Sequence, residues 1–194
     1  MEMNRETLYN GLNLMYIGEL AAIIGLFVGL LILFLPGAVG LSLLILLAAL
    51  VGAIVGVVGL ARLRGEHGDY MTALILLVVG VICNLISKNA TGALSVIMDF
   101  AGSVLALVRV YLVVRATNTF LDMAGRTDLE AEGRRAFYAL VASTVVAVVI
   151  SALTQVLSDS LGGLIVLLVI ISLVTIAGEA FYLIYLKHSA QALR

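Results

Sequence analysis

The sequence predicts an all-α protein: a polytopic transmembrane bundle of six helices arranged as three hairpins, with both chain ends in the cytoplasm. Three observations lead to this prediction. The 194 residues are 63% hydrophobic, with a mean hydropathy of +1.21, which is more apolar surface than a soluble domain of this size can bury. Five short hydrophilic breaks separate six long apolar runs. Most Lys and Arg residues fall on alternate breaks or at the chain ends.

Each apolar run is long enough to be a membrane span, because a helix needs about 20 residues to cross a hydrocarbon core of about 30 Å. The runs are continuous, whereas the strands of a transmembrane barrel alternate between apolar and polar residues. The spans belong to a single domain over residues 1–194, and they are predicted at residues 15–35, 39–62, 70–87, 93–115, 136–155 and 162–186.

The breaks differ in charge, and this difference predicts the orientation. Residues 36–38 carry no charge, residues 87–89 carry one cation, and residues 158–160 carry one anion. By contrast, residues 62–69 hold two Arg and residues 115–135 hold four. Cationic loops stay on the cytoplasmic side of a membrane. The two Arg-rich breaks and both termini are therefore predicted inside, in a multi-pass protein of the plasma (inner) membrane.

The tyrosines support the same orientation, since all seven fall near the predicted inner ends of spans. They are Tyr9, Tyr16, Tyr70, Tyr111, Tyr138, Tyr182 and Tyr185. Tyrosine rings are enriched at the headgroup level, so an aromatic belt is predicted there, with the lining of an inner vestibule as the alternative. In the longest break, Thr127 and Glu130 fit a capping box, which predicts a capped helix start over residues 127–136 on the cytoplasmic side.

Small residues recur every fourth position on the first two spans. The first span has Ala21, Gly25 and Gly29, and the second has Ala48, Gly52 and Gly56. Helices in lipid associate through such residues because their backbones can approach closely. The two faces are predicted to meet inside the first hairpin. The alternative gives one face to a second copy of the chain or to a partner membrane subunit.

Four ionisable residues lie within apolar runs: Glu19, Asp99, Arg109 and Glu179. A charge in hydrocarbon costs at least about 2.5 kcal/mol, so these groups are expected to face protein or water. Glu19, Arg109 and Glu179 lie at similar depth along their spans and are predicted to form a cluster with one excess negative charge. Protonation of a carboxylate, a bound cation or water could compensate that excess. Asp99 lies nearer the outer side of the membrane and is predicted to form a separate site on any path.

Further polar residues share helix faces with these charges. Ser172 and Thr175 lie on the face of Glu179, and Thr144, Ser151 and Gln155 share a face of the fifth span. The sequence therefore predicts a polar seam between the fourth, fifth and sixth spans. Two interpretations stay open: hydrogen bonds that join helices, typically about 0.6 kcal/mol each, or a path for an ion or solute.

No motif for catalysis, nucleotide binding or cofactor attachment is present, and a formal net charge of −1 gives no field that would favour binding to nucleic acid. The protein is therefore expected not to be an enzyme and to use no cofactor. The segment from Glu66 to Asp69 offers three metal-ligand types, but no matching pair occurs elsewhere, and no metal site is predicted. The partner that the composition implies is the lipid bilayer.

The residues from Gly25 to Arg64, with Pro36, Gly52 and Gly59, resemble the repeated hairpin of HdeD-like acid-resistance membrane proteins, which are also small six-span chains. Residues 58–73 resemble small uncharacterised six-span membrane proteins of Firmicutes. In length and span number the chain is similar to the substrate-binding subunits of energy-coupling factor vitamin transporters. The first resemblance implies a stress-response role, and the third implies an accessory or substrate-binding subunit of a larger transporter.

The leading functional hypothesis is a small integral membrane protein with a polar intramembrane site between spans four to six. That site is expected to bind or pass an ion or a small solute, in the manner of a transporter. The alternatives are a non-transporting structural or stress-response protein and a subunit of a larger transporter.

Overall fold

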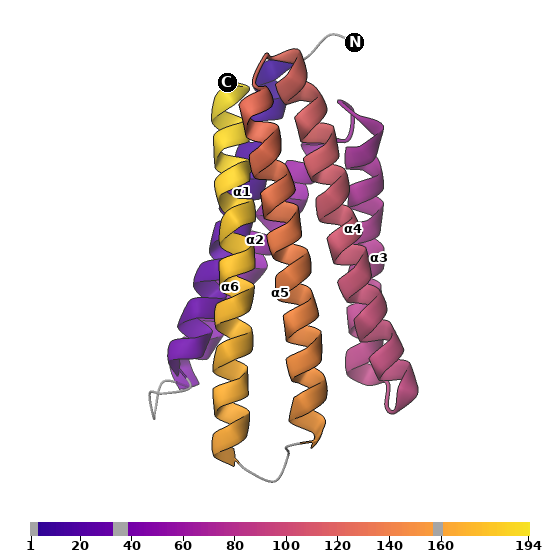
Figure 1. Ribbon diagram of the computed structural model, residues 1–194, viewed down its shortest axis with the longest axis vertical. Coiled ribbons are helices and arrows are strands. Elements are labelled where there is room, and N and C mark those ends of the chain that lie inside the picture. The colour runs from indigo at the N-terminus through magenta and orange to yellow at the C-terminus, as the bar shows by residue number, and fades with distance from the viewer. Residues whose placement is uncertain (1–3, 33–38, 157–160) are drawn as a thin grey trace.

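The computed structural model describes residues 4–32, 39–156 and 161–194, and it describes side chains for residues 4–32, 47–150, 163 and 165–194. Over the described residues it has no strand. Figure 1 shows long helices aligned with one axis, and α1 begins at the end of the bundle where α6 finishes. In chain order the elements are α1 (Arg5–Ile32), α2 (Val39–Leu63), α3 (Gly68–Asn89), α4 (Ala93–Met123), the 3₁₀ helix η1 (Thr127–Leu129), α5 (Glu130–Val156) and α6 (Leu161–Ala192).

Five helical segments in the described part of the chain are long and apolar enough to cross a membrane. They belong to α1, α3, α4, α5 and α6, while the apolar stretch described in α2 is the shorter segment Leu47–Leu63. The protein is thus an all-helical, multi-pass membrane protein. Several helices extend beyond the apolar runs: α4 continues to Met123, and α6 continues to Ala192. These extensions carry the polar residues of the sequence breaks.

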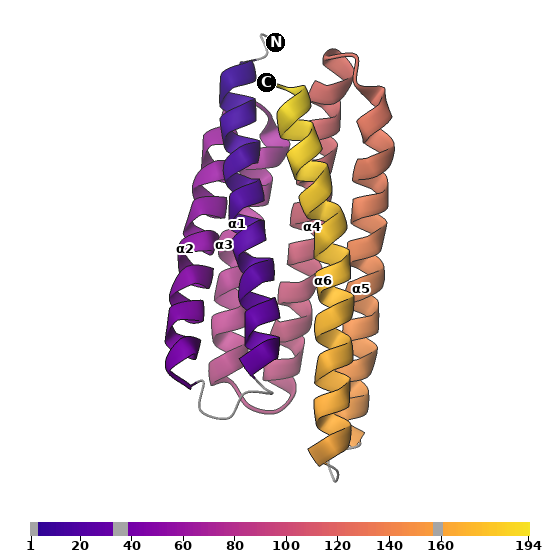
Figure 2. The same ribbon diagram turned by 90° about the vertical axis from the view of Figure 1, so that its left-hand side faces the viewer.

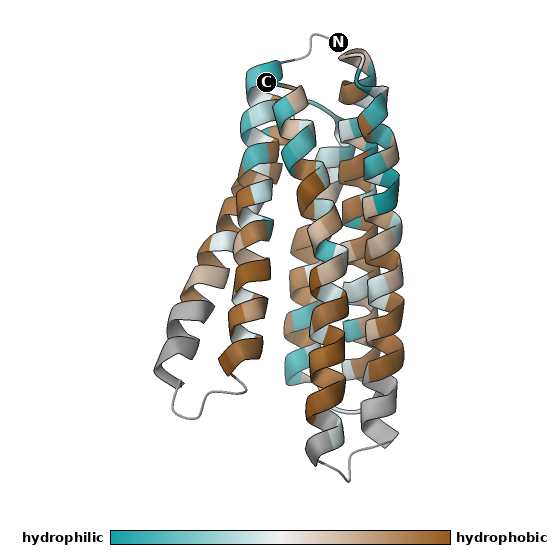
Figure 3. Cartoon of the chain, turned by 60° about the vertical axis from the view of Figure 1, so that its left-hand side comes forward, coloured by the Kyte–Doolittle hydropathy of each residue, from teal (hydrophilic) through white to brown (hydrophobic). Residues whose placement is uncertain are grey.

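The helices pack closely at one end of the bundle and diverge toward the other (Figures 1 and 3). Consecutive helices lie along one another, with α1 on α2, α3 on α4 and α5 on α6, and α1 also contacts α6 (Figure 2). Buried side chains come from the start of α1, the end of α2, the start of α3, the ends of α4 and α6, and the start of α5; they include Leu8, Leu12, Leu60, Leu63, Tyr70, Phe120, Leu140, Tyr185 and Leu193. This packed core lies at the end that holds the start of α1 and the end of α6.

Toward the other end, large apolar side chains point outward. Phe27 of α1, Ile82 of α3, Phe100 of α4 and Val149 of α5 are each at least 50% exposed. An apolar surface of this extent is unfavourable in water and suits a helix surface that faces lipid.

The contact between α1 and α2 depends on glycines. A Cβ atom on Gly18 would lie 2.7 Å from the Gly52 carbonyl oxygen and 2.7 Å from the Gly56 Cα. A Cβ atom on Gly59 would lie 2.7 Å from the Gly11 carbonyl oxygen. The two backbones can touch only because these positions have no side chain, which is how helices in lipid gain packing energy.

Of the residues on the two predicted packing faces, Ala21, Gly52 and Gly56 lie at the contact between α1 and α2, whereas Gly29 and Ala48 do not. Ala21 meets Gly52 directly, but a Cβ atom added to Gly29 would meet nothing within 4 Å, and Ala48 is exposed. A strict four-residue spacing advances about 400° per step and so drifts around a helix. Alternating steps of three and four residues stay on one face, and the observed contacts at Gly52, Gly56 and Gly59 follow that spacing. Gly25, the middle residue of the first predicted face, is half-buried.

The predicted helix start near residue 127 has a different cap. Thr127 was expected at the N-cap, but Arg126 holds that position without a side-chain cap, and Thr127 lies within η1. The chain turns at Gly125, whose φ of +71° favours glycine. Helical geometry then begins at Thr127, one residue before the start that the capping box predicts. Arg126 donates to both carboxylate oxygens of Asp128 at 2.9 Å, which holds this first turn in place of a capping box.

Three of the seven tyrosines are core residues instead of belt residues. Tyr70, Tyr182 and Tyr185 are almost completely buried. The Tyr70 hydroxyl hydrogen-bonds Thr117 at 2.8 Å, and Tyr185 donates to the Asn118 side-chain oxygen at 2.7 Å. Burying a large ring stabilises the core, and each hydroxyl needs such a partner there. The other tyrosines are at least partly exposed, so the aromatic belt prediction stays open for them.

Replacing Tyr185 with Phe is expected to lower stability by about 1–2 kcal/mol, because Asn118 would lose a buried hydrogen-bond donor while the ring packing is kept. Thermal unfolding in detergent measures this change. Tyr138→Phe is the matched control, since Tyr138 is 67% exposed. Equal melting temperatures for the two variants would contradict the assignment of Tyr185 to the core.

Candidate functional site

The embedded charges meet near the middle of the bundle. The Arg109 Nη2 atom of α4 lies 3.7 Å from the Glu19 Oε1 atom of α1. Their side chains are 27% and 22% exposed, so the pair is half-buried. Two residues that are 90 positions apart in sequence therefore come together in the fold. An ion pair of this kind satisfies both charges without placing either one against acyl chains.

Glu179 of α6 lies close to this pair. It interacts electrostatically with both Glu19 and Arg109. A cavity of about 170 Å³ is lined by Arg109 and Glu179 together with Ser103 and Thr144. In the described residues, Glu179 forms no ion pair within 4 Å. The cluster therefore has two carboxylates for one guanidinium, and it carries one excess negative charge when all three are ionised.

A larger pocket, of about 650 Å³, lies among α3, α4, α5 and α6. Asp99, Thr144, Thr175 and Glu179 all line it. Four of the residues proposed from sequence thus share one pocket, contributed by three different helices. Asp99 is exposed, whereas Thr144, Thr175 and Glu179 are half-buried. The lining includes no Lys or Arg side chain.

Each of the three cavities shares at least one lining residue with the next one. A pocket of about 250 Å³ between α1, α2, α3 and α4 is lined by Glu19 and Arg109 beside Gly18, Gly52 and Gly56. Arg109 also lines the 170 Å³ cavity, and Glu179 lines both that cavity and the 650 Å³ pocket. Arg109 thus joins the 250 Å³ pocket to the 170 Å³ cavity, and Glu179, with Ser103, Leu140 and Thr144, joins that cavity to the 650 Å³ pocket.

Several hydroxyls at the large pocket were missed from the sequence as site residues. They are Ser87, Ser103 and Ser143, which line it beside Ser95, a residue that the sequence already places on the helix face of Asp99. Ser87 and Ser95 each donate to the other's carbonyl oxygen, at 3.0 and 2.9 Å, and so join α3 to α4. Ser143 directly precedes Thr144, and Ser103 lies one turn after Asp99. Their short distance in sequence from Thr144 and Asp99 could have identified Ser143 and Ser103 as pocket residues. Ser87 had no such signal, because it falls in a predicted break between spans.

The remaining predicted site residues fall elsewhere. Ser172 is half-buried and lines none of these three cavities. The side chains of Ser151 and Gln155 lie outside the described residues. His67 is the N-cap of α3 and accepts the Asp69 backbone N–H at 3.1 Å, so the segment 66–69 has a structural role. Within the described ranges, no three His, Cys, Asp or Glu side chains form a group suited to a metal ion.

Comparison with known proteins gives no further assignment. No family model matches the chain. Searches of curated proteins and of solved structures return no significant match. The resemblances to HdeD-like proteins and to other small six-span proteins therefore stay predictions from the residues alone.

Proposed function

We propose that this protein binds or passes a cation through the polar cavities between α4, α5 and α6. The observation that carries this proposal is the 650 Å³ pocket, which two carboxylates line and no cationic side chain enters. Neither Asp99 nor Glu179 has an ion-pair partner within 4 Å in the described residues. Ionisable groups within a membrane are costly and mark ion pathways or binding sites.

The ligand class follows from charge and lining chemistry. Asp99 and Glu179 supply anionic oxygens, and Thr144 and Thr175 supply neutral ones. Oxygen ligands suit hard cations and protons. Within this proposal Glu179 is the carboxylate that takes the proton or cation. Arg109 is the counter-ion of Glu179 and also stays paired with Glu19 toward the inner side. Asp99 is a separate binding site toward the outer side.

We further propose six spans in three hairpins, with both termini on the cytoplasmic side of the bacterial inner membrane. In support, the hydrophilic residues gather at the end of the bundle that holds the start of α1 and the end of α6 (Figure 3). That end carries Arg62, Arg64, Arg115 and Arg126, and cationic loops are retained in the cytoplasm. The pairing of consecutive helices supports the hairpins.

Replacing Glu179 with Gln is expected to abolish cation flux, because the amide keeps the size of the side chain and removes its charge and its titration. The measurement uses proteoliposomes with a trapped pH-sensitive or sodium-sensitive dye and an imposed H⁺ or Na⁺ gradient. Glu66→Gln is the control, since Glu66 is an acidic loop residue that lines none of the three cavities. Unchanged flux in Glu179→Gln would remove Glu179 from the mechanism.

A structural role without transport is the second candidate, and the serine hydrogen bonds favour it. Ser87, Ser95 and Ser143 donate to backbone carbonyl oxygens, as side chains that join or brace helices do. Under this alternative the wild-type protein passes neither H⁺ nor Na⁺ in the same proteoliposomes, and Glu179→Gln changes only stability. Cation flux by the wild-type protein would dismiss it.

A further inference from the structure

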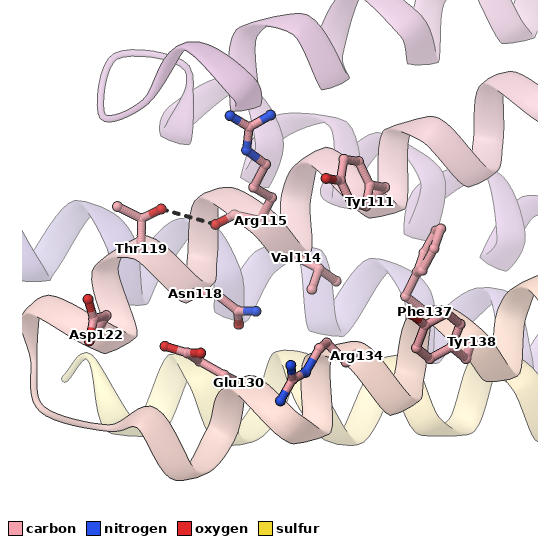
Figure 4. Close-up of a pocket in the computed structure, with 10 residues that line it drawn as sticks. All are labelled: Tyr111, Val114, Arg115, Asn118, Thr119, Asp122, Glu130, Arg134, Phe137 and Tyr138. Carbon is pink, nitrogen blue, oxygen red and sulfur yellow. Dashed lines mark hydrogen bonds between the residues drawn. The ribbon is translucent and has the colours of Figure 1, made fainter.

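A fourth pocket, of about 460 Å³, lies between α4 and α5 near the packed end of the bundle (Figure 4). It is separate from the cation site and shares no lining residue with the three cavities described above. Its lining holds charges of both signs: Arg115 and Asp122 from α4, and Glu130 and Arg134 from α5. Its volume is in the range of ordinary small-molecule sites.

Three of these four charges form no ion pair in the part of the chain that the structure describes. In the described residues, Asp122, Glu130 and Arg134 form no ion pair within 4 Å. Arg115 lies 3.4 Å from Asp69, yet its side chain is still 60% exposed. The Asn118 oxygen accepts from Tyr185, which fixes the amide and leaves its NH₂ group as a donor at the pocket. The pocket thus presents both cationic donors and anionic acceptors.

The polarity of the pocket changes along its length. The charged residues lie toward the connection between α4 and α5, while Tyr111, Phe137 and Tyr138 lie toward the middle of the bundle (Figure 4). The Tyr111 and Phe137 rings are 5.5 Å apart, and Tyr138 is 67% exposed. Aromatic side chains of this kind sit at the boundary between headgroups and acyl chains. The charged part then lies at headgroup depth and the aromatic part at the start of the hydrocarbon.

The length of the pocket also favours an amphiphile. Asp122 lies eleven residues after Tyr111 on α4, a distance of about 16 Å along a helix. The headgroup layer on each side of a bilayer is about 5–8 Å thick. A ligand that spans the pocket therefore needs a polar end and an apolar continuation.

We propose that the α4–α5 pocket binds a zwitterionic phospholipid with a primary ammonium, namely phosphatidylethanolamine. The phosphate meets Arg134 and the Asn118 amide, since a guanidinium forms paired hydrogen bonds with phosphate oxygens. The ammonium meets Glu130 and Asp122. The glycerol and first acyl carbons lie over Tyr111 and Tyr138. Phosphatidylcholine cannot donate hydrogen bonds to the two carboxylates, and phosphatidylglycerol is anionic and has no positive charge to offset them.

Native mass spectrometry of the purified protein tests this assignment, with phosphatidylethanolamine, phosphatidylcholine and phosphatidylglycerol of identical acyl chains added in turn. The wild-type protein is expected to retain phosphatidylethanolamine best. Arg134→Gln is expected to weaken that binding by about tenfold, as the loss of a charge-assisted hydrogen bond implies. Arg135→Gln, a neighbouring exposed arginine outside the pocket, is expected to bind like the wild type.

A second variant and a soluble probe complete the test. Glu130→Gln is expected to reduce the preference for phosphatidylethanolamine over phosphatidylglycerol, a selectivity that a simple loss of stability would not change. Equal binding of the three lipids by the wild type, or unchanged binding in Arg134→Gln, would overturn the proposal. If soluble O-phosphoethanolamine binds as tightly as the lipid and depends equally on Arg134, the pocket takes a free aminophosphate and the lipid assignment is wrong.

Discussion

Replacing Gly18 with Val is expected to destabilise the protein by about 3 kcal/mol or more, at the upper end of overpacking costs. A Cβ atom at this position would lie 2.7 Å from backbone atoms of both Gly52 and Gly56. Backbone atoms cannot rotate away as the tip of a side chain can, so α1 and α2 would have to separate. Circular dichroism during heating in detergent measures the loss, and size-exclusion chromatography reports whether the purified protein stays monodisperse.

Gly29→Val on the same helix is the matched control. A Cβ atom there meets nothing within 4 Å, and Val has a slightly higher helix propensity than Gly. This variant is expected to melt within about 2 °C of the wild type, since surface changes are usually worth less than about 0.5 kcal/mol. An equal loss of stability in both variants would show that glycine content, and not this contact, matters.

Replacing Arg109 with Gln is expected to cost about 3 kcal/mol, the lower end of the penalty for breaking a buried ion pair, because both partners are half-buried. Glu19, 3.7 Å away, would then lose its counter-ion. Glu179 would lose a cation with which it interacts electrostatically. For a chain of this length the change corresponds to a fall in melting temperature of about 6–12 °C.

The double variant Glu19→Gln with Arg109→Gln separates the ion pair from simple packing. Because it removes both charges of the pair, it is expected to recover a large part of the stability lost in Arg109→Gln. A double variant that is less stable than either single variant, with strictly additive losses, would mean that Glu19 and Arg109 do not interact in the folded protein.

The helical membrane class could be predicted from the sequence because length and hydropathy act over whole spans. The closeness of Glu19 and Arg109 was also predictable, since burial in lipid forces opposite charges at equal depth to seek one another. The glycine contacts were predicted only in part. Ala21 and Gly52 were identified, but sequence spacing alone does not give the crossing angle that selects Gly18 and Gly59 over Gly29 and Ala48.

The neutral hydroxyl groups that line the large pocket were harder to predict than the charged residues that line it. Asp99, Thr144 and Glu179 were selected as rare polar groups in apolar runs, and they line one pocket. Ser143 was not selected, because serine is common in membrane helices and its role depends on the close approach of Gly178. The charged pocket between α4 and α5 was not predicted at all. Its residues lie on two helix ends whose juxtaposition requires the turn at Gly125.

Cysteine accessibility tests most directly whether the embedded polar groups face a hydrated pocket inside the bundle. In a Cys83→Ser background, a cysteine at position 144 replaces Thr144, which lines the 650 Å³ pocket. A cysteine at position 149 replaces Val149, which is 54% exposed on the apolar surface. With a small cationic, membrane-impermeant thiol reagent in proteoliposomes, the Thr144→Cys protein is expected to react and the Val149→Cys protein to stay unmodified. An unreactive Thr144→Cys protein, or equal reaction at both positions, would contradict a hydrated cation site between α4, α5 and α6.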